Sequence, residues 1–481
     1  MRAGYAEGLR QLFADKAWVE FVADFGHAKK FFPDADVFPS VIVVRNPLNE
    51  HAPTHTNVCV IPRDDVPEKG LEEAVAKTTY ALPRTYFSKE PWALEPPDVA
   101  ALLMKVRTNG VPLRAVVPRL PVNGIKTGLN EAFLIDADEQ ARLVASDPAC
   151  AAIIKPYLRG QDIRRWKSPD KSRFMILLKS SSDNAWPWSA AKDEREAETI
   201  FAATYPSLFE RMKRFEEYRD PKSGKTRGLK HREDQGKFWW ELRPCAYYDV
   251  FTGPKIIYQA IQFHSRYTYE ADDVYGNNKT YFLRADNPAL LAILNSPLLW
   301  WYGWRHFIHM KDEALSNDQV KIAELPINAA LLDDERLLNA VNELLRTTDR
   351  IANAQTSMVD WLHQEFGVSR GLASLRQSAA LSFDEFIKAV RGGVAPGRKL
   401  TAAEVGELKR EYAATIEPAR ADRTEILRLE RSISDVVNAA YGLTAAEVQL
   451  MWGTAPPRMP LAHAGSTLEE RAEDPERDEE E

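Results

Sequence analysis

The spacing of apolar residues over the first 62 positions follows the pattern of a sheet with a flanking helix. Helical spacing over residues 5–15 predicts a helix. A strand pattern follows at 18–24, and the continuous β-branched run within residues 38–46 predicts a second, buried strand. Because about 50 residues are too few for a complete doubly wound domain, residues 1–62 are expected to form the closing edge of an α/β sheet.

Residues 111–330 alternate short apolar runs with turns, which predicts a mainly β region with inserted helices. Four of these runs match a strand pattern: residues 133–136, 173–179, 254–261 and 280–285. The preceding residues 63–110 are rich in proline and irregular, apart from a helix predicted at 98–108, and are interpreted as a linker.

Residues 331–452 are helical by spacing, with a break at the glycine-rich stretch 392–397. The last long helix carries a continuous apolar stripe. Gly442 is predicted to stop this helix, and Thr444 with Glu447 is predicted to form the capping box of a short final helix. Together these patterns predict an α+β fold with a C-terminal helical region.

The net charge of −7 is unevenly distributed. Residues 453–481 are first rich in proline and then acidic, so they are predicted to be a disordered tail. Within them, residues 464–481 hold nine acidic and two basic side chains, so the remaining body is about neutral. Residues 153–179 hold eight Lys and Arg against two acids, and residues 211–232 hold nine against three. Such stretches suit phosphate contact, although charged runs are also ordinary solvated surface.

Composition and missing motifs exclude several classes of protein. No apolar run reaches the roughly 18 residues of a membrane span, and no signal-peptide pattern is seen. Cys59, Cys150 and Cys245 lie far apart, which predicts a reducing, cytoplasmic location without disulfides. His51 and His55 share a proline-containing loop and are not expected to bind zinc. No Walker loop, metalloprotease helix or nucleophile elbow occurs.

The first motif that carries candidate chemistry is GIKTGLNEAF at residues 124–133. Two glycines flank Lys126 and Thr127, and glycine lets a backbone approach a ligand closely. Lys, Thr and free amide groups are natural phosphate contacts. The motif therefore indicates a phosphate-binding loop, with a plain turn before the following strand as the alternative.

The second motif, IIKPYLRGQDIRRW at residues 153–166, packs four cations and two aromatic rings around a Gly-Gln-Asp turn. Arginine can bind guanine bidentately or hold phosphate, and glutamine can pair with adenine. The candidate DNA contacts are therefore Lys155, Arg159, Gln161, Arg164 and Arg165. The alternative is that Asp162 pairs with an arginine and only holds the turn.

Two further motifs follow along the chain. In FWWELRPC at residues 238–245, adjacent tryptophans on a strand would face opposite ways, so at least one is expected in the core and Arg243 is the candidate contact. LLAILNSPL at residues 290–298 predicts a helix that stops at Asn-Ser-Pro. Glu385 and Lys388 loosely match a nuclease motif, but their helical setting favours a structural role.

In this order the four motifs resemble the TaqI-like C-terminal specificity domain of type IIG restriction-modification enzymes and of the methyltransferases in BREX-type phage defence. The first two motifs are the most specific, and PKIIY, ELPI at 324–327 and DVVNAAYGLTAAEV at 435–448 add to the resemblance. It covers about four fifths of the chain. It implies that residues 111–330 are a target-recognition domain for double-stranded DNA, followed by a helical domain at 331–452.

The N-terminal segment resembles the end of the family's adenine-N6 methyltransferase domain, in which an aromatic residue before proline stacks on an extruded adenine. That residue would be Phe32, with Phe31 competing for the role and core packing of Phe32 as the alternative. The family's glycine-rich cofactor turn and its polar-Pro-Pro-aromatic loop are not found. Gln161 and Trp166 also stand where relatives often have Arg and Tyr, which puts the contact chemistry there in doubt.

The expected function is the DNA-recognition portion of a site-specific adenine-N6 methyltransferase from a restriction-modification or phage-defence system. This chain is expected to be inactive alone and to bind no cofactor or metal. S-adenosylmethionine would be bound by a catalytic subunit or domain that acts as its partner, in addition to duplex DNA. The alternatives are a complete enzyme with an unrecognised active site, a protein-interaction subunit and a nonfunctional fragment.

Overall fold

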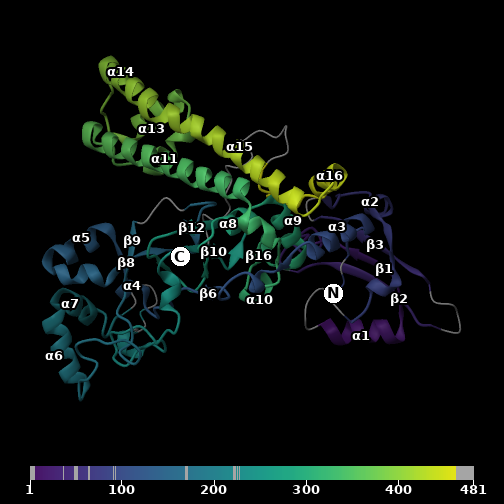
Figure 1. Cartoon of the computed structure of the whole chain (residues 1–481), viewed down its shortest axis with the longest axis horizontal. Coiled ribbons are helices and arrows are strands. Elements are labelled where there is room, and N and C mark those ends of the chain that lie inside the picture. The colour runs from purple at the N-terminus through teal and green to yellow at the C-terminus, as the bar shows by residue number, and fades with distance from the viewer. Residues whose placement is uncertain are drawn as a thin grey trace. The chain divides into compact units, whose positions relative to one another are not determined.

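The computed structural model of the chain, drawn in Figure 1, describes residues 6–35, 37–47, 53–62, 65–89, 92, 94–167, 172–219, 224, 226 and 228–461. Its internal contacts divide it into two compact units. Unit 1 comprises residues 1–109, 307–316 and 444–455, and unit 2 comprises residues 110–306, 317–443 and 456–481. Packing alone defines these units, so the functional segments expected from the sequence stay predictions.

Unit 1 is built on a four-stranded mixed sheet with the strand order β2-β1-β3-β4. Its elements are α1 (Glu7–Lys16), β1 (Trp18–Asp24), β2 (Ser40–Arg45), β3 (His55–Val60), α2 (Leu71–Thr78), β4 (Tyr80–Pro83), α3 (Pro97–Thr108), β15 (Ile308–His309), β16 (Leu315–Ser316) and α16 (Ala445–Gly453). β1 pairs antiparallel with β2 and parallel with β3. Val19 and Val22 of β1 pack with Val58 and Leu82 in the core. These two valines are three positions apart and would lie on opposite faces of a regular strand, but the pairing of β1 with β2 shifts register between Val19 and Phe21.

The strand β2 lies at the edge of this sheet, and it corrects the expectation of a buried strand. Val41, Val43 and Val44 are 51%, 43% and 41% exposed. β2 pairs with β1 alone, so its β-branched residues suit an extended backbone without being covered on both faces. We call these three valines the β2 surface.

Unit 2 contains two four-stranded sheets, with the orders β12-β10-β14-β6 and β13-β8-β9-β7. The first is antiparallel throughout, and the second contains one parallel pair, β13 with β8. The strands of unit 2 are β5 (Val111–Pro112), β6 (Val122–Asn123), β7 (Leu134–Asp136), β8 (Ile154–Leu158), β9 (Arg173–Ile176), β10 (Lys255–Gln259), β11 (Ile261–Gln262), β12 (Tyr267–Glu270), β13 (Tyr275–Gly276), β14 (Thr280–Arg284) and β17 (Pro326–Ile327). The four predicted strands are therefore confirmed as β7, β9, β10 and β14.

Short helices alternate with these strands: α4 (Asn130–Phe133), α5 (Ala137–Ser146), α6 (Glu194–Thr204), α7 (Pro206–Arg214), α8 (Ala289–Leu294), α9 (Pro297–His306) and α10 (Gln319–Ile322). The predicted stop of α8 is confirmed at Asn295. The expected strand at the two tryptophans is wrong, because a turn stands there and both Trp239 and Trp240 are buried. The buried carboxylate of Glu241 holds this turn by accepting hydrogen bonds from the backbone N–H groups of Phe238 and Ser181.

The helical region contains α11 (Glu335–Phe366), α12 (Leu372–Leu375), α13 (Phe383–Gly393), α14 (Ala402–Glu411) and α15 (Glu417–Ala440), and Figure 1 shows α11 and α15 side by side. Gly442 has the left-handed φ of +69° expected of a helix stop. The capping box of Thr444 and Glu447 is confirmed. Glu385 forms the same motif with Ser382, which accounts for the loose nuclease match. The predicted α+β fold class is confirmed.

The C-terminal segment partly corrects the expected disorder. α16 continues to Gly453, and Pro456, Pro460 and Leu461 are buried, so part of the segment 453–461 is packed. The acidic residues 462–481 lie outside the described residues. Within the described ranges, no helix combines the length and the apolar character needed to cross a membrane.

Candidate nucleic-acid interface

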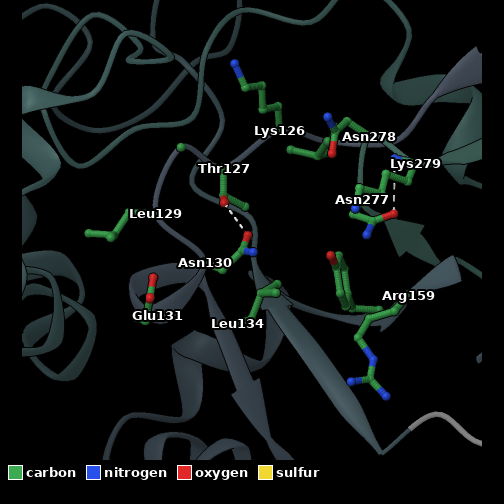
Figure 2. Close-up of a pocket in the computed structure, with 13 residues that line it drawn as sticks. Lys126, Thr127, Leu129, Asn130, Glu131, Leu134, Arg159, Asn277, Asn278 and Lys279 are labelled. Atoms are coloured by element: carbon green, nitrogen blue, oxygen red, sulfur yellow. Dashed lines mark hydrogen bonds between the residues drawn. The ribbon is translucent and has the colours of Figure 1, made fainter. Parts of the chain in front are cut away.

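A polar pocket of about 420 Å³ opens on unit 2 where three segments meet. We call it the basic pocket, and its lining comprises residues 125–131, Leu134, Tyr157, Arg159 and 277–279. In Figure 2 the side chains of Lys126 and Arg159 extend away from its centre on opposite sides. Asn277, Asn278 and Lys279 stand together along one wall. The pocket thus joins the first two sequence motifs to a turn that neither motif contains.

The Lys126 loop, residues 124–128, requires both of its glycines. A Cβ on Gly124 would lie 2.2 Å from the carbonyl oxygens of Gly276 and Asn277, which is too close for any side chain. Gly128 has a φ of +72°, which strongly favours glycine. The close approach expected at Gly124 is therefore made by the protein's own backbone and not by a ligand.

Arg232 clamps this loop from beneath and is 7% exposed. Its guanidinium donates hydrogen bonds to the carbonyl oxygens of Thr127 at 2.6 Å, Trp239 at 2.8 Å and Glu241 at 2.9 Å. It also lies 4.8 Å from the ring centroid of Phe133. Burial lowers the pKa of Arg232 to about 10, so the side chain is still a cation at neutral pH. One arginine therefore joins the first and third motifs.

Thr127 belongs to the scaffold of the loop. It is 3% exposed, and its hydroxyl donates to the Asn130 side-chain oxygen at 2.7 Å, as drawn in Figure 2. That bond places the first residue of α4 against the loop. The Thr127 hydroxyl, which the sequence suggested as a phosphate contact, therefore holds the loop in place. The Lys126 side chain of the same loop is exposed.

Lys126 and Arg243, two candidate contacts from separate motifs, meet at one carboxylate. Asp234 lies 2.8 Å from the Lys126 ammonium and 3.4 Å from the Arg243 guanidinium. The two cationic side chains are 50% and 48% exposed, whereas that of Asp234 is 12% exposed. The carboxylate therefore holds two solvent-facing cations together. An arrangement of this kind can present paired positive charges to phosphate.

The 153–166 motif uses several of its charges internally. Arg159 forms an ion pair with Asp162 at 2.9 Å, and the Arg159 backbone N–H also donates to that carboxylate at 2.9 Å. The Gln161 amide oxygen accepts from the same guanidinium at 2.8 Å. Arg164 is exposed and donates to the Gln161 carbonyl at 2.6 Å. The alternative of an internal Asp162 pair thus describes the turn, and Arg159 still lines the basic pocket.

Arg165 and Trp166 face the helical region of unit 2. The Glu430 carboxylate on α15 accepts from the Arg165 guanidinium and from the Trp166 indole N–H. Arg165 also donates to the Asn295 carbonyl at 2.7 Å, and its side chain is 18% exposed. Trp166 has a left-handed φ of +74°, which is a strained backbone for a bulky residue. We therefore assign Arg165 to this joint and not to the candidate DNA surface.

Among the described residues of the second basic stretch, 211–232, three cations pair with acidic side chains of the same fold. Arg211 is 5% exposed, pairs with Glu139 and donates to the Ala132 carbonyl at 2.9 Å. Lys213 and Lys230 both pair with Glu216, at 2.9 and 2.5 Å. Net charge along the sequence is therefore a poor guide to surface charge here.

Lys155 and Lys179 lie near each other beside β8 and β9. The Lys179 ammonium sits 4.4 Å from the ring centroid of Tyr248. Burial lowers the pKa of Lys179, and the like charge of Lys155 lowers it further. Lys155 is half-buried on β8 and stays a candidate phosphate contact.

The Asn278 turn, residues 277–280, is the part of the basic pocket that sequence reasoning missed. It connects β13 to β14, and Asn278 and Lys279 are exposed. The string Gly-Asn-Asn-Lys between two short β patterns is a turn signature that could have revealed it. It lies far from the recognised motifs in sequence, so nothing local linked it to Lys126.

Phe32 lies in unit 1 and is 52% exposed, so it is not a core residue. Phe31 is 37% exposed and packs on Phe25 with ring centroids 5.0 Å apart. Both rings are therefore exposed, and Phe32 is the more exposed of the two. This difference favours Phe32 over Phe31 for stacking on a base.

The part of the chain that the structure describes contains no group of three or more His, Cys, Asp or Glu side chains placed to hold a metal ion. His51 lies outside the described residues, and the His55 ring is 2.9 Å from the Thr54 hydroxyl. β1 is followed by a single glycine, Gly26, and β3 by Ile61 and Pro62. Neither strand leads into the glycine-rich turn that S-adenosylmethionine requires, so these residues do not fit that cofactor.

Comparisons with known proteins give a match to a short family model and distant likenesses to solved structures. A family model described as a domain of unknown function, DUF8810, matches residues 332–437. No curated protein matches the chain. The type IIL restriction-modification enzyme MmeI, solved in complex with DNA, has a TM-score of 0.40 and 11% identity over 92% of this chain and 46% of that one. The type IIG restriction endonuclease BpuSI has a TM-score of 0.33 and 10% identity over the same shares. The chain thus spans less than half the length of either enzyme.

Proposed function

We propose that unit 2 is the DNA-recognition module of a site-specific adenine-N6 methyltransferase in a restriction-modification or phage-defence system. The observation that carries the proposal is the meeting of Lys126 and Arg243 at Asp234, beside a pocket lined by Arg159 and Lys279. These side chains come from four segments of the sequence. Exposed cations around an open polar pocket suit the phosphates and base edges of a duplex.

A titration with duplex DNA at several salt concentrations tests this proposal. Each phosphate contact releases counterions, so four cations at the pocket give a log–log salt slope of about −3.6. Lys126→Ala and Arg243→Ala should each make the slope about 0.9 less steep. Lys409→Ala, which removes an exposed charge from α14, is the matched control and should leave the slope unchanged. Binding without salt dependence would sink the proposal.

Methyl transfer is proposed to come from a catalytic α/β domain, on the same or another polypeptide, that binds S-adenosylmethionine. The β2 surface supports this, because Val41, Val43 and Val44 are exposed on an edge strand that can accept a further strand. Phe32 would then stack on an adenine flipped out of the duplex.

Two measurements test whether S-adenosylmethionine binds to a separate catalytic domain and not to this chain. Calorimetry of this chain should detect no S-adenosylmethionine binding, and tight binding would overturn the proposal. Co-expression with a neighbouring reading frame that encodes the glycine-rich and Asn-Pro-Pro-aromatic loops should yield a complex. Val43→Lys should weaken that complex, whereas Lys77→Ala on α2 should not, because Lys77 is an exposed charge outside the β2 surface.

The exposed β2 surface also favours a second candidate, a protein-interaction subunit that does not bind DNA. This function predicts the same complex with a partner but no salt-dependent DNA binding by the chain. The titration with Lys126→Ala and Arg243→Ala therefore separates the two functions.

A further inference from the structure

The backbone of the Asn278 turn is held rigidly from within. The Thr280 N–H donates to the Asn277 carbonyl at 3.0 Å. The Asn277 side-chain oxygen accepts from the Lys279 N–H at 3.2 Å and from the Thr280 hydroxyl at 2.7 Å. Asn277 and Thr280 thus use their side chains to fix the turn, whereas Asn278 and Lys279 contribute backbone groups.

Neighbouring segments hold the same turn from outside. The Asn123 side-chain amide donates to the Asn278 carbonyl at 3.0 Å, and the Ala260 N–H donates to the Lys279 carbonyl at 2.8 Å. The Ile125 N–H donates to the Gly276 carbonyl at 2.7 Å. The turn and the Lys126 loop therefore form one hydrogen-bonded unit. A side chain that projects from it starts from a fixed backbone position.

The side-chain carboxamide of Asn278 projects from the hydrogen-bonded unit that the Asn278 turn and the Lys126 loop form. Asn278 is exposed, it lines the basic pocket, and its amide makes no hydrogen bond to another of the described side chains or backbone groups. A carboxamide offers a donor and an acceptor side by side, which matches the N6 donor and N7 acceptor of adenine in the major groove. Because the backbone at Asn278 is already held in place, binding has to restrict only the rotamers of the side chain.

We propose that Asn278 reads an adenine in the recognised sequence, while Lys279 and Lys126 hold flanking phosphates. This inference rests on the proposed DNA-recognition function. It assigns base readout to a turn outside the motifs that identify the domain. A contact from Asn278 to phosphate alone is the competing outcome.

Selection from a library of duplexes with a randomised segment tests the inference with the full chain. The wild-type protein should recover a sequence motif, and Asn278→Ala should lose the preference at one adenine while keeping the other positions. Its affinity for the wild-type motif should fall roughly 5- to 150-fold. Asn339→Ala, which removes an exposed amide from α11, should leave the motif and the affinity unchanged.

Lys279→Ala provides the contrasting pattern, because it should weaken binding to all sequences equally and make the salt slope about 0.9 less steep. Each variant should have the same melting temperature as the wild type. A loss of DNA binding then reflects a lost contact to DNA and not unfolding of the variant. An unchanged motif with Asn278→Ala overturns the inference, including the case in which affinity falls equally for all sequences. So does a wild-type protein that binds DNA with salt dependence but selects no motif. A wild-type protein that does not bind DNA instead refutes the proposed function itself.

Discussion

Arg232 gives the sharpest test of how the candidate site is built. Arg232→Met keeps much of the side-chain length but removes every donor, leaving the carbonyls of Thr127 and Trp239 without this partner. The Glu241 carbonyl loses the same donor but keeps a hydrogen bond from the Gly236 N–H at 3.2 Å. An unsatisfied buried acceptor costs about 1–3 kcal/mol, so the first two would cost about 2–6 kcal/mol if both stayed dry. The Thr127 carbonyl adjoins an open pocket that water can enter. We therefore expect a loss of about 2–4 kcal/mol.

Thermal unfolding followed by circular dichroism measures this loss. Unit 2 is larger than a typical single domain, so each kcal/mol lowers its transition by about 1–2 °C, and the transition should fall by about 2–8 °C. Arg173→Met removes an exposed arginine from β9 and is the matched control, with an expected change within about 0.5 kcal/mol. Arg232→Lys should be intermediate, because one ammonium can satisfy only part of the carbonyl set.

Limited trypsin digestion tests the local consequence. Lys126 is exposed, but the next residue, Thr127, is buried and its carbonyl is bound to Arg232. Releasing the loop should speed cleavage after Lys126, which mass spectrometry identifies from the new fragment. If Arg232→Met has the same melting temperature as Arg173→Met and trypsin cleaves it after Lys126 no faster than the wild type, Arg232 does not hold the Lys126 loop.

Three other substitutions probe separate parts of the molecule. Glu430→Ala removes the carboxylate that pairs with the Arg165 guanidinium and accepts from the buried Trp166 indole N–H, so we expect a loss of about 3–5 kcal/mol in urea unfolding. Arg165→Met should restore part of this loss in the double variant, and additive losses would contradict the coupling of Arg165 to Glu430. Asp234→Asn should raise DNA affinity at low salt and steepen the salt slope, whereas weaker binding would mean that the carboxylate positions the cations. Lys105 and the Thr444 cap lower the pKa of Glu447 to about 2, so its stabilisation is complete above pH 4.5 and is lost as pH falls toward 2. Glu447→Gln should therefore cost about 1 kcal/mol at pH 7, with the gap from wild type closing across that window in urea titrations; a gap that persists at pH 2 would contradict the assigned pKa.

Features that depend on local sequence were predictable. The stop at Gly442, the capping box at Thr444 and the strands β7, β9, β10 and β14 follow from glycine conformation, side-chain capping and alternation. The exposure of Val41 on β2 was not predictable in this way, because a β-branched run fits an edge strand and a buried strand equally well. Which of the two forms depends on the neighbours of the strand.

The candidate site was predictable as a set of motifs but not as an arrangement. Pairing of Lys126 and Arg243 through Asp234 joins residues more than 100 positions apart, and no periodic signal reports such a contact. Arg165 and Arg164 look equivalent in sequence, yet one is bound by Glu430 and the other is exposed. Charge and residue type in the sequence suggested which residues could contact DNA. Only their burial and their interaction partners in the structure separated the residues that hold the fold from those that are exposed at its surface.

The Asn278 turn has a consequence for how this protein could change. Its shape depends on the side chains of Asn277 and Thr280, on the side-chain amide of Asn123 and on the backbone N–H of Ala260. None of these interactions uses the side chain at position 278. Substitutions at that position can therefore accumulate at little cost to folding, so a lineage could acquire a new target sequence without first acquiring a new scaffold.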